Sequence, residues 1–462
     1  MPETTLITNG LVVTEQGTFA IDILVRGQRI VAMGKDLPHN VDRIIDANGA
    51  LVLPGIVDPH VHIQLDTGIY RTDDDWAVGT RVAAFGGVTT VIDFATQFPG
   101  QDVRQAVQNR HAEVDDKAYV DYGLHVMLTD LPRDDATLRR WMDDLIALGT
   151  PAAKVYTTYR PNYYQDDAAL LRVFRAAAQA HVLVMVHAEN DAIVTESTQR
   201  LVEAGKTSLA YHAMARPPFA EAEAVHRVLY LADEAGCPVY IVHCSTDRAV
   251  DLVHQAKQRG QIAFAETCPQ YLLLDDRAYL GPHPEWVIMQ PPLRSLDIVE
   301  KQWEHLAAGR IDAIGTDHCD YALSQKTATG NFTNTPGGIP GLETSLPLMA
   351  TYAVQRGPLT WPDLVRLMSA HPARLFGLYP RKGTLMPGSD ADIVIYDPHG
   401  TSRIDAAQLH GVSGYTPYQH MEVEGRVRLT MVRGRVVVED GEWVGTEGWG
   451  VFVPGKHFEK GL

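Results

Sequence analysis

The sequence predicts an α/β protein, a (β/α)8 TIM barrel with a small β-sandwich domain formed from both terminal segments. Between about residues 50 and 320, eight short apolar runs alternate with longer amphipathic segments. Outside this region both flanks alternate apolar and polar residues with a period of two, which is typical of antiparallel hairpins. Polar side chains also gather where the apolar runs end, as they do at the mouth of such a barrel.

The eight apolar runs have the length and composition of buried parallel strands. They are residues 51–62, 86–94, 119–128, 152–159, 182–190, 238–245, 261–271 and 311–319. The segments between them predict amphipathic helices, among them 135–149, 166–180, 220–236 and 297–310, and several end near a glycine, where a helix C-cap belongs. Near-continuous apolar strands that alternate with helices indicate a parallel sheet covered on its outer face. A doubly wound open sheet is the alternative fold.

The terminal segments predict a second, smaller domain. Residues 5–34, 388–398 and 425–444 alternate apolar and polar positions and are separated by turn residues. Neither terminal half is large enough to be stable alone, so the two are expected to pair into one sandwich. We therefore expect the first part of the sandwich at 1–51, the barrel at 52–378, and the second part of the sandwich at 379–462. The last residues, 448–462, are expected to form a C-terminal tail or an oligomer arm.

The composition excludes several classes of function. The chain has 462 residues, 45% of them hydrophobic, and a formal net charge of −17, which argues against binding nucleic acid or an anionic membrane surface. No apolar stretch approaches the ~18 residues of a membrane span, and the N-terminus lacks the layout of a signal peptide. The four cysteines form no CxxC pair, which fits a reducing compartment. We therefore expect a cytoplasmic protein that acts on a small molecule.

Six polar residues stand at the carboxyl ends of five predicted strands. In order they are His60 and His62, then Lys154, His187, His243 and Asp317. The two histidines of HVH lie two positions apart, so on an extended chain both imidazoles point to the same face. Taken singly, each residue could be a structural histidine, an exposed lysine or a helix cap. Because all of them fall at the same end of the barrel, together they indicate one site.

The chemistry of this set favours divalent metal ions. Neutral imidazole and carboxylate are good ligands for Zn2+ and similar ions, and one ion takes about three or four of them. Four histidines and one aspartate exceed the needs of one ion and suit two. A lysine ammonium would repel the metals, but Lys154 carboxylated by CO2 on its N6 atom would be an anion able to bridge two ions ~3.5–4 Å apart. Zn2+ is the expected metal, with Mn2+ as the alternative.

Several segments resemble those of the cyclic amidohydrolases, the group that includes dihydropyrimidinase, hydantoinase, allantoinase and dihydroorotase. Among them are PGIVDPHVHIQ, AAKVYTTY, MVHAEN, YIVHCS, GTDHC, PGLETSLPLM and HPARLFGLYPRKGTLMPGSDADIVIYDP, and the resemblance covers nearly the whole chain. It implies a two-metal centre in which carboxylated Lys154 bridges the ions. The first ion would be bound by His60, His62 and Asp317, and the second by His187 and His243. It also implies a homo-oligomer, since hydantoinases are commonly tetramers.

The resemblance also implies a reaction. A hydroxide that bridges the two ions attacks the carbonyl of a cyclic amide or imide, and Asp317 takes the proton of that hydroxide and passes it to the departing ring nitrogen. Tyr159 matches the family tyrosine whose hydroxyl stabilises the oxyanion. The ring is expected to be held by Tyr159 and by the backbone around Gln290 and Gly337. Both of these positions depart from the family pattern, which has a small residue before PPLR and an asparagine in its PNG turn.

The motifs favour some members of this group over others. The segments HIQ, KVYTTY, HAEN and QKTATGNFTNTPGG resemble hydantoinases and dihydropyrimidinases, which open a hydantoin or dihydropyrimidine ring to an N-carbamoyl amino acid. The segment FAETCPQYLLLDD resembles allantoinases, the second candidate. Dihydroorotase ranks lower because Gln64 replaces the arginine of its HxHxR pattern. A non-enzymatic scaffold similar to the collapsin-response mediator proteins is least favoured, because all six ligand positions are present here.

Two loops at the predicted barrel mouth are expected to select the ring substituent. They are LDTGIYRTDD, after the first strand, and RPNYYQ, after the fourth. In barrel enzymes, the loops at this face determine which substrate binds. Ile69, Tyr70, Tyr163 and Tyr164 are expected to form an apolar wall that suits an aryl or alkyl substituent. His318 is expected to point away from the metals and to have a supporting or structural role.

Overall fold

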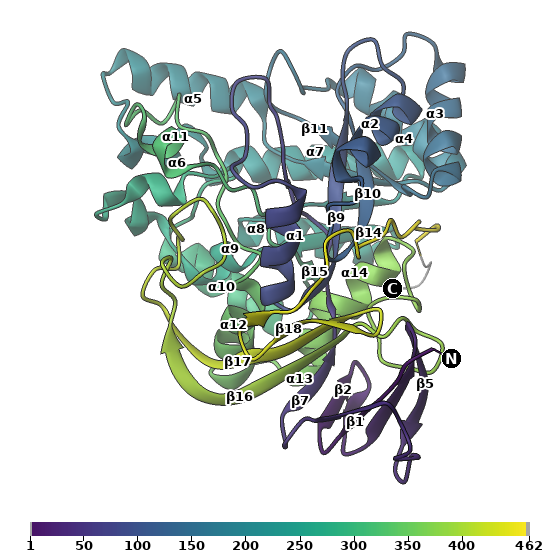
Figure 1. The fold of residues 1–462 in the computed structure, drawn as a ribbon. Helices are drawn as coiled ribbons and strands as arrows, with labels where there is room; N and C mark the ends of the chain where they lie inside the picture. Colours follow the sequence, from purple (N-terminus) through teal and green to yellow (C-terminus); the bar gives the residue numbers. More distant parts are fainter. Residues whose placement is uncertain (1, 459–462) are drawn as a thin grey trace.

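The computed structural model describes residues 2–458, and its central feature is a parallel barrel above a β-sandwich (Figure 1). The barrel strands pair in the order in which they occur in the sequence. They are β8 (Ile56–Asp58), β9 (Val88–Gln97), β10 (Asp121–Leu128), β11 (Ala152–Tyr156), β12 (Leu183–His187), β13 (Val239–Ile241), β14 (Ala263–Thr267) and β15 (Ala313–Ile314). Val61, just after β8, forms a bridge with His318, just after β15, so the first and last strands lie side by side. The predicted (β/α)8 barrel is confirmed, and the open-sheet alternative is wrong.

Helices cover the outside of the barrel (Figure 1). The longer ones are α1 (Trp76–Phe85), α2 (Val103–Val114), α3 (Asp135–Ala147), α4 (Asp167–Ala180), α5 (Asp191–Glu203), α7 (Pro218–Ala235), α8 (Asp247–Gln258) and α10 (Leu296–Ala307). Apolar residues at helical spacing turn one face inward, as Leu138, Met142 and Leu145 do in α3. Helix α7 ends at Gly236 with φ 64°, as expected for a glycine that closes a helix.

Shorter helical turns complete the barrel and its connections. They are α6 (His212–Ala215), α9 (Pro269–Leu273), α11 (Leu323–Thr327), α12 (Ser345–Met349), α13 (Trp361–Val365) and α14 (His371–Leu375), with single turns at Leu209–Tyr211, Asp276–Leu280 and Pro284–Val287. Wider turns at Ala350–Gln355 and Arg366–Ala370 extend α12 and α13. None of the helices in residues 2–458 is long and apolar enough to cross a bilayer.

The run 51–62, expected as one barrel strand, is divided at Gly55. Its first half, β7 (Leu51–Pro54), pairs with β16 in the terminal sheet, whereas β8 pairs with β9 in the barrel. A Cβ atom at Gly55 would lie 2.0 Å from Oγ1 of Thr89, so only glycine fits where the chain passes from one domain to the other. The expectation of a single continuous strand is therefore wrong.

The terminal segments form the predicted sandwich. One sheet has the order β5–β4–β1–β6 and the other the order β19–β18–β17–β16–β7–β2–β3. The strands are β1 (Thr4–Thr8), β2 (Leu11–Thr14), β3 (Gly17–Phe19), β4 (Asp22–Arg26), β5 (Arg29–Gly34), β6 (Arg43–Asp46), β16 (Ile393–Arg403), β17 (Glu422–Val432), β18 (Arg435–Glu439) and β19 (Glu442–Trp443). Apolar residues of both sheets, such as Ile23 and Ile393, share one core. The sandwich thus unites the two ends of the chain.

The segment after β19 packs against its own barrel. Val453 N donates to Tyr122 O at 2.7 Å, and Gly455 N donates to Gly149 O at 2.8 Å. Val453 and Phe458 also join the apolar cluster inside the barrel. The expected tail therefore covers the barrel at the amino ends of its strands. Its last residues, 459–462, lie outside the described residues.

Candidate active site

The carboxyl ends of the barrel strands open into a cavity of about 520 Å3. Nearly all of the predicted site residues line it, namely His62, Lys154, Tyr159, His187, His243, Gln290, Asp317 and Gly337. His60 is fully buried and lies directly beneath them. The residues come from six strands and the loops that follow, so the barrel brings together side chains up to 277 positions apart in the chain (from His60 to Gly337).

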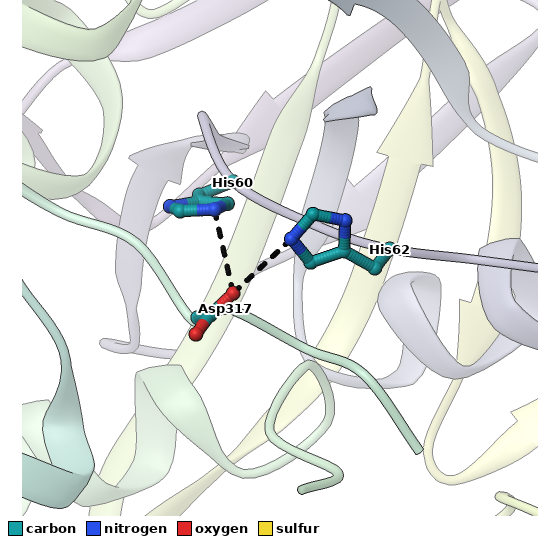
Figure 2. Close-up of side chains that lie close together, drawn as sticks. All are labelled: His60, His62 and Asp317. Carbon is teal, nitrogen blue, oxygen red and sulfur yellow. Dashed lines mark ion pairs between the residues drawn. The ribbon is translucent and has the colours of Figure 1, made fainter. Parts of the chain in front are cut away.

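Two histidines and an aspartate form the first cluster of the site (Figure 2). The Nε2 atoms of His60 and His62 both lie 3.3 Å from Oδ1 of Asp317. Strand β8 ends at Asp58, but Val61 keeps the chain extended through its bridge to His318, so both imidazoles turn to the same side as their spacing predicts. Asp317 adopts φ 52°, an uncommon conformation for a residue other than glycine, which turns its carboxylate towards the two rings.

Lys154 and two further histidines lie beside this cluster. Lys154 Nζ is 3.1 Å from Nε2 of His60. The ring centroid of His243 lies 5.4 Å from that of His60 and 4.6 Å from that of His187. Lys154 therefore stands next to the first cluster, and His243 connects that cluster to His187.

The electrostatics of the site leave these side chains ready to act as ligands. Burial lowers the pKa of His60, His187 and His243, so their imidazoles are neutral at pH 7. Burial alone would raise the pKa of Asp317, but nearby His60 and His62, with Lys154, bring it below its usual value. Burial lowers the pKa of Lys154 to about 8.

The donor set fits divalent metal ions. Ligand atoms of His60, His62 and Asp317 lie within 4.8 Å of one another. Within residues 2–458, the buried Nδ1 atoms of His62 and His243 have no hydrogen-bond partner. Imidazoles and a carboxylate that converge on one point are the ligand set that Zn2+ and related ions prefer.

Two buried glutamates that the sequence analysis did not single out hold the histidines in place. Glu266 Oε1 lies 2.8 Å from His60 Nδ1 and also accepts the backbone N–H of His243 at 2.9 Å. Glu189 Oε2 lies 2.7 Å from His187 Nε2. Each glutamate occupies one ring nitrogen and leaves the other nitrogen of the same ring available to a metal. A charged residue at the end of an otherwise apolar strand, as in AFAET, was the signal that could have revealed Glu266.

Tyr159 lies beside His187. Its ring centroid is 5.0 Å from that of His187, and the guanidinium carbon of Arg216 lies 5.1 Å from the Tyr159 ring centroid. Arg216 also donates a hydrogen bond to Glu189. Burial raises the pKa of Tyr159, so its phenol stays protonated and can donate a hydrogen bond.

Gln290 and Gly337 lie on two segments that are joined beside the cavity. The backbone N–H of Gly338 donates to Ile288 O at 3.0 Å. The buried ammonium of Lys326 donates to Ile288 O at 2.8 Å, to Pro336 O at 3.0 Å and to Gly338 O at 2.9 Å. Lys326 therefore fixes the backbone on either side of both predicted ring-binding positions.

His318 has the supporting role expected of it. Its Nε2 lies 3.2 Å from Oδ2 of Asp74, and its Nδ1 accepts the backbone N–H of Gly341 at 3.1 Å. Both ring nitrogens are therefore occupied by protein groups, whereas Nδ1 of His62 and Nδ1 of His243 have no hydrogen-bond partner.

The predicted apolar wall is only partly present. Ile69, Tyr70 and Tyr163 line the cavity as expected. Tyr164 does not, because its ring lies under the guanidinium of Arg160, 3.6 Å from the guanidinium carbon, and it lines a separate surface groove. The expectation for Tyr164 is therefore wrong: neighbouring residues of the loop point in different directions, and Arg160 stacks on the outer one.

Comparisons with known proteins agree with this geometry. The model of the amidohydrolase family matches residues 51–437. A D-hydantoinase of Geobacillus stearothermophilus is 36% identical, covering 97% of this chain and 96% of that protein. A D-phenylhydantoinase of Escherichia coli is 37% identical, covering 98% of each chain. The crystal structure of a dihydropyrimidinase from Brevibacillus agri superposes with a TM-score of 0.96 at 34% identity, covering 99% of this chain and 100% of that one.

Proposed function

Because this chain belongs to the amidohydrolase family and is a metal-dependent cyclic amidohydrolase of the hydantoinase type, we propose that it opens 5-substituted hydantoins to N-carbamoyl amino acids. The observation that carries the proposal is the convergence of His60, His62 and Asp317 beside Lys154 at the mouth of the barrel. The names of the D-hydantoinase of Geobacillus stearothermophilus and the D-phenylhydantoinase of Escherichia coli favour the D enantiomer. A binding scaffold without activity, and the allantoinase alternative, are less well supported by those names.

The metal centre in this proposal has two ions. His60, His62 and Asp317 would hold one ion, and His187 and His243 the other. Lys154 would bridge them after its neutral amine adds to CO2, a reaction that forms an N–C bond and releases one proton. The lowered pKa of Lys154 and its contact with His60, in the cavity that His187 and His243 also line, support this role. Zn2+ is the proposed metal, with Mn2+ as the alternative, since imidazole and carboxylate suit both.

When bound, the two ions would polarise the scissile carbonyl and lower the pKa of the attacking water. Asp317 would accept a proton from that water and deliver it to the leaving ring nitrogen, which its position beside both histidine rings allows. Tyr159, protonated and fixed against Arg216, would donate its O–H to the carbonyl oxygen as negative charge develops there. Ile69, Tyr70 and Tyr163 would pack against an aryl or alkyl substituent at C5.

A panel of ring substrates tests the proposal. Metal-loaded protein should release N-carbamoyl amino acids from D-5-phenylhydantoin and D-5-benzylhydantoin faster than it hydrolyses dihydrouracil, allantoin or dihydroorotate. The L enantiomers serve as the stereochemical control. If allantoin or dihydroorotate were the best substrate, or if the L enantiomers were preferred, the proposed specificity would be wrong.

The proposal extends to the assembly and location of the protein. We propose a homotetramer because the family resemblance implies one, and sedimentation of the purified chain would test it. A reducing, cytoplasmic location is supported by the four cysteines, all of which are free and buried.

A further inference from the structure

The side chain of Gln290 occupies the space that a side chain at position 337 would need. A Cβ atom built on Gly337 would lie 1.7 Å from Oε1 of Gln290, 2.3 Å from its Cδ and 2.4 Å from its Nε2. Contacts this short do not occur between real atoms. The Gln290 carboxamide in its present position and any larger residue at 337 therefore exclude one another.

Gly337 is needed for space and not for backbone conformation. Its φ lies outside the left-handed region, so its backbone could accommodate any residue, in contrast to Gly330, which has φ +61°. The two positions are also the two at which the chain departs from the family pattern of a small residue and an asparagine. The structure links the two departures, because the Gln290 side chain fills the space that a side chain at position 337 would take.

The backbone that carries this pair has little freedom to adjust. Lys326 donates to carbonyls of both segments, and His212 Nε2 donates to the carbonyl of Met289 at 2.8 Å. A larger residue at 337 would therefore have to displace the Gln290 side chain and not the backbone.

The Gln290 carboxamide is available to a ligand. Gln290 is half-buried and lines the same cavity as Asp317 and Tyr159. No hydrogen bond links its amide to another group in residues 2–458, although a primary amide carries two donor hydrogens and one acceptor oxygen. Its N–H and C=O lie side by side, and this arrangement is complementary to an –NH–C(=O)– edge of a ring.

We propose that Gln290 is a specificity-determining residue, whose carboxamide pairs with the edge of the ring that is not cleaved, and that Gly337 is its spatial counterpart. This proposal rests on the proposed function. The scissile edge must face Asp317 and Tyr159, so the carboxamide is left with the other edge. In hydantoin and dihydrouracil that edge is the N–H and C=O of a ureide. In succinimide and glutarimide the same N–H is replaced by CH2, so these rings cannot donate to Gln290.

Two matched substrate pairs and one apolar variant test the role of Gln290. Gln290→Leu keeps a branched side chain of similar bulk and removes its hydrogen bonds. It should lower kcat/KM on hydantoin and on dihydrouracil by about tenfold or more, the effect of losing one or two hydrogen bonds. On succinimide and glutarimide the change should stay within about threefold. Gln258→Leu, at an exposed position on α8, is the control and should leave all four rates unchanged.

A second measurement is independent of catalysis. Gly337→Asn alone should lower Tm, because its side chain meets Gln290, and adding Gln290→Ser should restore most of the loss. Parallel loss of activity on all four rings, or additive effects on Tm, would overturn the proposal. If the wild type opened none of these rings, the proposed function would fail and the substrate role with it. The Tm cycle would still report whether the two residues exclude one another.

Discussion

Glu266 offers the most informative single substitution near the metal site. Its Oε1 faces His60 Nδ1 at 2.8 Å and accepts the His243 N–H at 2.9 Å, while its Oε2 accepts the hydroxyl of Tyr240 at 2.8 Å. Removing the whole side chain would leave three buried donors unpaired, at about 1–3 kcal/mol each, which is comparable with the total stability of many domains. Glu266→Ala would therefore report on the stability of the fold and not on the role of Glu266 in the site.

Glu266→Gln separates charge from shape. The amide oxygen can still accept from His60 and His243, and the amide nitrogen then faces Tyr240, whose hydroxyl can rotate to accept. The hydrogen-bond geometry is kept, but His60 loses the negative charge that makes it a stronger ligand. We expect the fold to persist and the affinity for Zn2+ to fall about 10- to 100-fold, the usual effect of changing a group that supports a ligand.

The assay is a competition between the protein and a chromophoric zinc chelator. Glu343→Gln is a matched control, because Glu343 also pairs with an imidazole, that of His410 at 2.7 Å, away from the site. The control should bind Zn2+ like the wild type. An unchanged affinity in Glu266→Gln, or an equal loss in both variants, would refute the reasoning that Glu266 acts through His60.

Asp317, Lys326 and Glu15 can each be tested by a single substitution. Asp317→Asn should keep the fold and the Tm but lower kcat by at least about 100-fold, the usual contribution of a general acid–base group, and a near wild-type rate would contradict the proton transfer assigned to Asp317. Lys326→Met removes three hydrogen bonds to buried carbonyls, so thermal unfolding should show a lower Tm. Steady-state kinetics should show that KM rises by a larger factor than kcat falls. An unchanged KM would show that Lys326 does not position the ring-binding segments. The hydrogen bond from Arg374 lowers the pKa of Glu15 from its usual 4.5, so this pair stabilises the fold above that pH and the stabilisation is lost as the pH falls through the lowered value. The Tm difference between Glu15→Gln and the wild type should therefore be present at pH 7 and shrink as the pH falls through the lowered pKa of Glu15, and a difference that does not change with pH would contradict the assignment.

Periodicity in the sequence was enough to predict the barrel and the direction in which His60 and His62 point. The common direction of the His60 and His62 side chains depends only on an extended backbone, which the chain keeps even after β8 has ended. The other strand-end residues could be grouped for the same reason, since parallel strands bring their carboxyl ends to one face. The division of the run 51–62 at Gly55 was not visible, because it depends on the close approach of Thr89.

Contacts between distant segments account for what the sequence analysis missed. Glu266 supports His60 across 206 positions, and Lys326 joins two loops through backbone carbonyls that have no sequence signature. The orientation of Tyr164 is decided by Arg160 and not by the composition of its loop. The relation between Gln290 and Gly337 is likewise a matter of shared volume, so two apparent departures from a motif became one feature only in three dimensions.

In the proposed function, the six strand-end side chains form a two-ion centre that opens a cyclic amide. Its most direct test is the rate of N-carbamoyl product formation from D-5-phenylhydantoin while Zn2+ is added stepwise to metal-free protein. We expect little activity without metal, a rise that ends at two ions per chain, and no comparable rise for Lys154→Ala. Full activity in the metal-free protein, or saturation at one ion per chain, would contradict it.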